Sequence, residues 1–200
     1  MPNCSQMERL PSFIGIGPAR TGSTWLHHAL GEVAGLPSEK ESNFFSDRYH
    51  KGIRWYAKRF VHLDTIPIGE ICPYFSSVDA IDRIHEYLPD CKIICTLRDP
   101  VDRAYSHYKL LRREGYAAGG FEETIATQVQ PSEGNRYAFY LRKWQERFGN
   151  DRVLVTIYDD LRSDPQAHLN QVCDFIGAQK IVLVSGAFPG TPEIISSLSL

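Results

Sequence analysis

The stretch Phe13-Ile-Gly-Ile-Gly-Pro-Ala-Arg-Thr-Gly-Ser-Thr-Trp-Leu26 reads as a short apolar strand, a glycine turn and the start of a helix. Glycines let the backbone turn sharply, and the N–H groups at a helix start favour an anion. Residues 17–24 therefore have the outline of a P-loop. The usual lysine after the last glycine is replaced by Ser23, and the cation is Arg20, two residues before Gly22. The pattern predicts a phosphate-like anion site and removes the usual case for magnesium.

A second stretch, Ile93-Ile-Cys-Thr-Leu-Arg-Asp-Pro-Val-Asp-Arg-Ala-Tyr-Ser-His-Tyr108, also reads as a strand that leads into a helix. Arg98 stands at the strand end, where ligands of open α/β sheets bind, and Ser106 lies on the helix that follows. Together they are expected to hold a second anion, which favours a nucleotide with two separate anionic groups as the ligand. The alternative role for Arg98 is a salt bridge with Asp99 or Asp102.

Along the rest of the chain, apolar strands alternate with amphipathic helices. This alternation predicts the fold class α/β, a P-loop-like three-layer sandwich with a central parallel β-sheet flanked by helices. Two hundred residues fit a single domain, which we expect to span residues 1–200. The expected strands cover residues 12–16, 68–71, 92–97 and 152–157, and the expected helices cover residues 23–33, 51–60, 78–88, 100–113, 135–148 and 165–176.

Composition limits the partners and the compartment. The formal charge of −2 argues against a general nucleic-acid binder. No window approaches the ~18 apolar residues of a membrane span, and the first residues lack the apolar core of a signal peptide. The five cysteines are odd in number and lack metal-ligand spacing. We therefore expect no nucleic acid, no membrane and a reducing, cytoplasmic location.

Taken together, these segments resemble the sulfotransferases that use 3'-phosphoadenosine 5'-phosphosulfate (PAPS). Residues 13–26 resemble the family's 5'-phosphosulfate loop, and residues 97–108 resemble its 3'-phosphate motif, in the form found in heparan-sulfate-type and related bacterial enzymes. Lys40-Glu-Ser-Asn-Phe-Phe45 resembles the family's Lys-Glu-x-x-Phe-Phe segment, and Gly69-Glu-Ile-Cys-Pro-Tyr74 resembles its Gly-Glu-Lys-Ser-Pro-x-Tyr segment. The likeness covers residues 12–177.

The resemblance implies an enzyme that moves a sulfuryl group from PAPS, as co-substrate, to a hydroxyl or amine of a small-molecule or glycan acceptor. Glu41 would be the general base that takes the acceptor's proton, and Arg20 would stabilise charge on the leaving oxygen. No metal is implied. The expected cofactor-binding residues are Arg20, Thr21, Gly22, Ser23, Thr24 and Trp25 for the 5'-phosphosulfate, and Arg98 and Ser106 for the 3'-phosphate.

The chain departs from the family pattern in two places. Ile71 and Cys72 stand where relatives often have lysine and serine, at a segment near the acceptor. Relatives continue into a basic, glycine-containing loop that closes over the nucleotide, whereas Lys180 is the last cation here. Residues 178–200 are therefore expected to be an atypical or truncated C-terminal segment.

Two other functions remain open from the sequence. One is a small-molecule kinase that uses ATP and magnesium, against which stand the missing Walker lysine and the arginine, rather than an aspartate, after Leu97. The other is a non-catalytic, truncated sulfotransferase-like domain that binds nucleotide or a partner. His27 and His28 are alternative bases, although a histidine on a helix face is more often packed or solvated. The acceptor's identity and the oligomeric state are not predicted.

Overall fold

A computed structural model describes residues 9–127 and 136–183, and within these ranges it contains a four-stranded sheet in which every pair of neighbours is parallel. The strand order is β2-β1-β3-β4, with bounds Phe13–Gly15 (β1), Gly69–Ile71 (β2), Lys92–Leu97 (β3) and Val153–Ile157 (β4). β1 and β2 are buried along their whole length, as expected of strands covered on both faces. The parallel sheet predicted from the sequence is confirmed.

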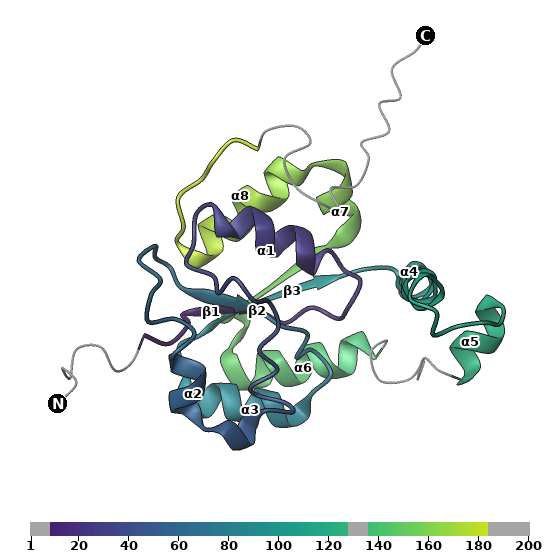
Figure 1. The fold of residues 1–200 in the computed structure, drawn as a ribbon. Helices are drawn as coiled ribbons and strands as arrows, with labels where there is room; N and C mark the ends of the chain where they lie inside the picture. The colour runs from purple at the N-terminus through teal and green to yellow at the C-terminus, as the bar shows by residue number, and fades with distance from the viewer. Residues whose placement is uncertain (1–8, 128–135, 184–200) are drawn as a thin grey trace, which may run out of the picture.

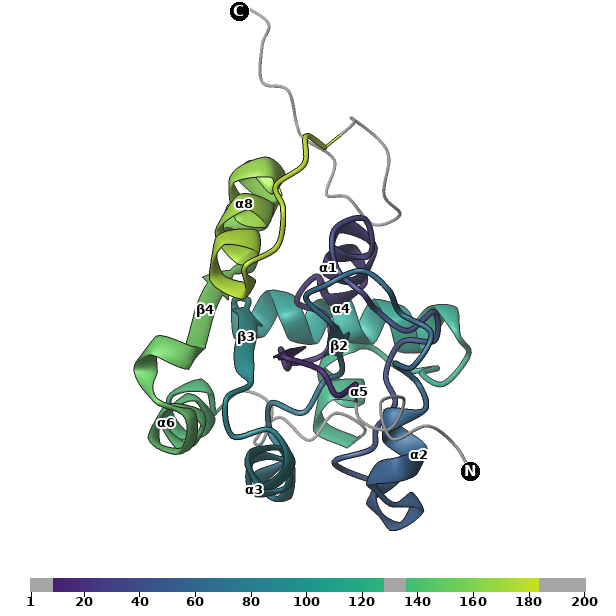
Figure 2. The same ribbon diagram turned by 90° about the vertical axis from the view of Figure 1, so that its left-hand side faces the viewer.

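Helices cover both faces of this sheet (Figure 1). One layer contains α1, α7 and α8, and the opposite layer contains α2, α3 and α6, whereas α4 and α5 extend beyond the end of the sheet. Figure 2 shows the same two layers from the side. The helix bounds are Ser23–Gly31 (α1), Ile53–Ala57 (α2), Val78–Tyr87 (α3), Pro100–Arg113 (α4), Phe121–Thr127 (α5), Tyr137–Phe148 (α6), Tyr158–Ser163 (α7) and Pro165–Ile176 (α8), with 3-10 turns at Tyr49–Lys51 and Asn150–Arg152.

Each layer packs its own apolar core against the sheet. On the α2, α3 and α6 side, the side chains of Tyr56, Phe60 and Trp144 are fully buried. On the α1 and α8 side, Trp25 and Leu30 meet residues of α8. The sheet is thus held from both faces, and the ends of its strands are left to carry polar groups.

Several helix bounds differ from the sequence expectation. The helix expected over residues 51–60 covers only Ile53–Ala57. Gly52 sets its start, because its backbone φ of 76° is not helical. The helix expected to reach residue 33 ends at Gly31. α5 and α7 were not predicted, since each is short and buries a single side chain, Thr124 or Leu161, too few for a helical pattern.

Some expectations fall outside the described residues. The helix expected from residue 135 begins at Tyr137, and residue 135 itself lies outside the described ranges. Of the expected atypical segment, residues 184–200 also lie outside them. Among the residues that are described, none of the helices combines the length and the apolar character needed to cross a membrane.

Candidate functional site: an anion pocket between two strand ends

The loop after β1 takes a shape that its residue types make possible. Gly22 has a φ of 90°, and a Cβ there would lie 2.7 Å from the Leu161 Cδ2 atom, so only glycine fits without strain. Arg20 also lies in the left-handed region, with a φ of 75°. The Thr21 hydroxyl donates a hydrogen bond of 2.8 Å to the Pro18 carbonyl oxygen and is buried. Thr21 therefore shapes the loop from within.

Helix α1 begins without a cap of its own. Gly22 occupies the N-cap position, offers no side-chain hydrogen bond, and no acidic residue follows in the first turn. The first N–H groups of a helix have no partner within the helix, and the helix dipole places partial positive charge there. The start of α1 is therefore suited to an external anion.

The end of β3 presents a second cation. Asp99 does not pair with Arg98, because its carboxylate caps α4 by accepting from the N–H groups of Val101 (2.9 Å) and Asp102 (3.0 Å). The Arg98 guanidinium lies 4.4 Å from the centroid of the Tyr158 ring. Its Nε is buried and has no hydrogen-bond partner among the described residues. An unsatisfied buried donor on a cation fits an anionic ligand.

The two elements meet in one pocket with a volume of about 330 Å³, within the range of small-molecule sites. Arg20 Nε donates to Ser106 Oγ at 3.2 Å, which joins the loop to α4 across 86 positions of sequence. All the predicted ligand-binding residues except Thr21 line it. The pocket is lined by Arg20, Gly22, Ser23, Thr24, Trp25, Arg98, Ser106, Arg113 and Tyr158.

Positive charge is concentrated in this pocket. Burial, followed by the charges of Arg113 and Arg98, lowers the pKa of the Arg20 guanidinium from its ordinary value. A guanidinium nevertheless stays protonated in proteins. Arg113 pairs at 4.0 Å with Glu114, which is not among the residues that line the pocket, and the lining itself contains no acidic side chain. The like charges in the lining repel one another, and a bound polyanion would relieve that repulsion.

Lys40 connects this pocket to the predicted base. Its Nζ donates to Ser23 Oγ (2.9 Å) and to Thr24 Oγ1 (3.4 Å), and it pairs with Glu41 Oε1 at 3.0 Å. The Glu41 side chain is 41% exposed, so an acceptor could reach it. The sequence reading assigned no role to Lys40, although its place directly before Glu41 was the available signal. Tyr158 was likewise missed.

Two other predicted residues have mainly structural surroundings. The Trp25 side chain is 2% exposed and packs edge-on against His168, so most of it belongs to the core. His27 forms a hydrogen bond with the Pro37 carbonyl oxygen at 3.1 Å, and burial lowers its pKa. His27 is therefore a packed histidine of α1.

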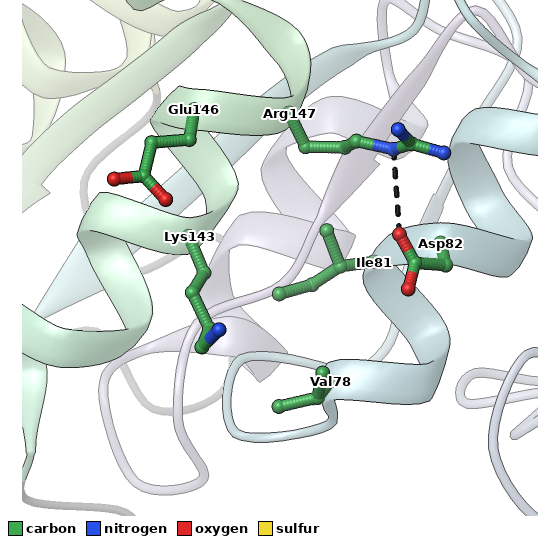
Figure 3. Close-up of a pocket in the computed structure, with 6 residues that line it drawn as sticks. All are labelled: Val78, Ile81, Asp82, Lys143, Glu146 and Arg147. Carbon is green, nitrogen blue, oxygen red and sulfur yellow. Dashed lines mark ion pairs between the residues drawn. The ribbon is translucent and has the colours of Figure 1, made fainter.

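A second hollow lies away from this pocket, between α3 and α6 (Figure 3). It is lined by Val78, Ile81, Asp82, Lys143, Glu146 and Arg147. Arg147 pairs with Asp82 at 3.4 Å, so two of the hollow's four charged side chains already neutralise each other. Among residues 9–127 and 136–183, no group of three or more His, Cys, Asp or Glu side chains is arranged to hold a metal ion.

The fold and the pocket define a P-loop-like α/β protein with a cationic site across two strand ends. A family model described as "Sulfotransferase domain" matches residues 10–185. The chain belongs to this sulfotransferase domain family, as the resemblance in the sequence had implied.

Individual relatives agree with the family. The chain is 33% identical over 212 residues to the mouse protein named bifunctional heparan sulfate N-deacetylase/N-sulfotransferase 4, covering 93% of this chain and 24% of that protein. A sulfotransferase structure from Alicyclobacillus acidocaldarius has a TM-score of 0.80 at 22% identity, covering 94% of this chain and 89% of that one. A mouse sulfotransferase complexed with PAP has a TM-score of 0.54 at 19% identity, covering 89% and 61%. The chain thus spans about a quarter of the length of its curated relatives.

Proposed function

We propose that this protein transfers a sulfuryl group from PAPS to a hydroxyl or amine, with Glu41 as the general base. The observation that carries the proposal is the convergence of Arg20, Arg98 and Arg113 with the uncapped start of α1 in one pocket. PAPS carries a phosphosulfate at one end and a phosphate at the other, which matches two anion-binding elements joined by the Arg20–Ser106 contact.

The proposed roles follow the two elements. The loop residues Arg20 to Trp25 take the 5'-phosphosulfate through backbone N–H groups and the hydroxyls of Ser23 and Thr24. Arg98 and Ser106 take the 3'-phosphate. The acceptor oxygen or nitrogen bonds to sulfur, the bond from sulfur to the 5'-phosphate oxygen breaks, and adenosine 3',5'-bisphosphate (PAP) leaves. Glu41 removes the acceptor's proton, and Arg20 and Lys40 stabilise the charge that develops.

The acceptor is proposed only by class, as a small molecule or a glycan. The curated relatives are named for heparan sulfate N-sulfotransfer, which supports testing an amine on a glycan first. Glu41 is half-exposed beside the pocket, and Lys40 next to it supplies a cation that could meet an anionic acceptor. Hydroxyl acceptors of small size form the second group to be tested.

The test begins with calorimetric titration of the chain with PAP, compared with ATP and magnesium. Binding of PAP, followed by transfer from PAPS to an acceptor, is the expected result. Binding of ATP with magnesium alone would favour a kinase, and PAP binding without transfer to any acceptor would favour a non-catalytic nucleotide-binding domain.

The base is tested by Glu41→Gln, which keeps the size of the side chain and removes its basicity. We expect at least a 100-fold loss of kcat, the order contributed by a positioned general base, with unchanged PAP affinity. Glu39→Gln is the matched control, because Glu39 lies two residues away with its side chain 86% exposed and pairs with Arg59. Equal activity of Glu41→Gln and the wild type would exclude Glu41 as the base.

We also propose that residues 1–200 form one domain and that the protein works in a reducing, cytoplasmic compartment. Support for the compartment comes from four buried cysteines, which are free thiols: Cys72, Cys91, Cys95 and Cys173. A single cooperative unfolding transition and full thiol titration after denaturation without reductant are the expected results.

A further inference from the structure

The turn that carries the proposed base has an unfavourable backbone. Glu41 and Asn43 both lie in the left-handed region, with φ of 61° and 51°, and they flank Ser42. This conformation costs a residue with a side chain roughly 1 kcal/mol or more. Such strain persists only where the surroundings fix the backbone. Something beneath the turn must therefore hold it.

The hold comes from a buried carboxylate in β2. Ser42 is fully buried, and its backbone N–H donates to Glu70 Oε1 at 2.9 Å. Glu70 is itself 2% exposed, and its other oxygen accepts from the Tyr56 hydroxyl at 2.7 Å. Both carboxylate oxygens therefore have donors, one on the turn and one in the aromatic core.

The rest of Ser42 is fixed as well. Its hydroxyl forms a hydrogen bond with the Tyr74 hydroxyl at 3.2 Å and accepts from the Phe44 N–H at 3.1 Å. Its carbonyl oxygen accepts from Arg48 Nη1 at 3.3 Å. Because its amide, hydroxyl and carbonyl all form hydrogen bonds, Ser42 cannot rotate without breaking several of them. The backbone conformations of Glu41 and Asn43 on either side are therefore restrained as well.

A carboxylate such as that of Glu70 is unfavourable to bury if its only role is to fill the core. Burial raises its pKa, and the hydrogen bonds from Ser42 and Tyr56 and the charge of Arg59 oppose that rise only in part. Apolar residues of similar volume often serve stability as well as a buried charged group does. What an apolar residue cannot do here is accept the Ser42 N–H.

We propose that Glu70 is a positioning residue for sulfuryl transfer, which fixes Glu41 and Lys40 against the anion pocket by holding the Ser42 amide. The path runs from Glu70 to Ser42, then to Lys40 and Glu41, and from Lys40 to Ser23 at the start of α1. The inference rests on the proposed function, since Glu41 is the group being positioned. It adds a residue that touches neither the anion pocket nor the acceptor.

The first test compares Glu70→Ala with Glu70→Gln. Alanine leaves the Ser42 N–H and the Tyr56 hydroxyl without acceptors, whereas glutamine keeps an oxygen for Ser42 and offers its amide to the Tyr56 oxygen. We expect Glu70→Ala to lower kcat by about 10- to 100-fold, the cost of misplacing a reacting group by a fraction of an ångström to an ångström. PAP affinity and the KM for PAPS should stay unchanged, and Glu70→Gln should restore most of the activity.

The second test separates positioning from general damage by a double-mutant cycle with Glu41→Gln. If Glu70 acts through Glu41, Glu70→Ala should lower kcat clearly less once Glu41 is replaced, and only the part of the loss that acts through Lys40 should remain. Equal loss in both backgrounds would overturn the inference. Should Glu70→Ala not fold, Tyr56→Phe replaces it in the cycle, because it removes one hydroxyl and loosens the same carboxylate, and the same non-additivity is expected.

The outcomes also separate the role of Glu70 from the proposed sulfuryl transfer. A wild-type chain that binds PAP and transfers sulfuryl, but shows an additive cycle, overturns the role of Glu70 and leaves the proposed function standing. A wild-type chain that transfers nothing to any acceptor overturns both.

Discussion

Helices α1 and α4 both follow a strand of the same sheet, yet their first turns are finished differently. α4 begins with Asp99, whose carboxylate satisfies two N–H groups, and with a proline in its first turn. α1 begins with Gly22, which has no side chain to offer. The unit of β1 and α1, here called the open unit, therefore leaves its first backbone N–H groups without a side-chain acceptor. The unit of β3 and α4, here called the closed unit, satisfies two of its N–H groups with Asp99 and presents the side chains of Arg98 and Ser106 instead.

The difference shows two ways of building an anion site from one local structure. Where the helix start is open, the backbone itself is the binding group and a glycine is required. Where it is closed, the backbone serves as a frame and charge comes from an arginine. The four predictions that follow test this contrast, beginning with the largest expected effect.

Acid should weaken the layer that carries the open helix. His168 of α8 packs against Trp25 in the first turn of α1, and burial lowers its pKa to about 4. Above about pH 6.5, the ordinary value, both states are neutral. Between pH 6.5 and about pH 4, the His168 side chain is protonated in the unfolded chain but not in the folded one. The free energy of unfolding therefore falls by about 3 kcal/mol across that window.

Urea unfolding at pH 7 and at pH 4 measures this loss, with His168→Phe as the control. Phenylalanine keeps an aromatic ring beside Trp25 and cannot titrate, so this variant should lose less stability in acid by about that amount. Identical pH dependence of the two proteins would mean that folding does not shift the pKa of His168, and would contradict the prediction.

Replacing Arg98, the arginine of the closed unit, should weaken the binding of an anion there. We expect Arg98→Ala to lower PAP affinity by about 100-fold, because a charge-assisted contact to phosphate contributes up to ~3 kcal/mol. Arg83→Ala is the matched control, since the Arg83 guanidinium also lies 4.4 Å from a tyrosine ring, that of Tyr49, but on α3. Calorimetry should show a loss for the first variant alone.

Placing a side chain on the open unit should damage shape and binding together. Gly22→Ala adds a Cβ 2.7 Å from Leu161 at a φ of 90°, and we expect a loss of about 1–2 kcal/mol in stability and roughly tenfold in PAP affinity. Gly177→Ala has a similar φ of 79° with open space around its Cβ. That control should lose stability by thermal denaturation and keep its PAP affinity.

Opening the closed unit should cost stability without adding a binding site. Asp99→Ala removes the cap of α4, for which we expect a loss of about 1 kcal/mol and little change in PAP affinity. Ser77→Ala, which removes the cap of α3, should behave alike in denaturation. A large change in PAP affinity for Asp99→Ala would show that the frame and the binding group are not separate.

The sequence predicted the parallel sheet and most of the pocket because both depend on local patterns. Gly22, Ser23 and Arg98 are identified by their places relative to a strand end. The contacts of Lys40 with Ser23, and of Arg98 with Tyr158, join segments far apart in the chain and have no local pattern. Thr21 was assigned to the 5'-phosphosulfate through the family resemblance, by its backbone N–H or its hydroxyl, and the structure shows that the hydroxyl donates to the Pro18 carbonyl oxygen.

The place of α7 beside the loop has a consequence for how the protein assembles. Leu161 lies against Gly22, and the Arg98 guanidinium lies over the Tyr158 ring, so a chain synthesised only through α4 contains both anion motifs without the α7 residues that pack against them. The nucleotide site is then complete only after α7 has been synthesised and has packed against the loop. A bound bisphosphate would protect the whole molecule rather than one loop, adding about 2.7 kcal/mol to its resistance to unfolding at 100 times Kd.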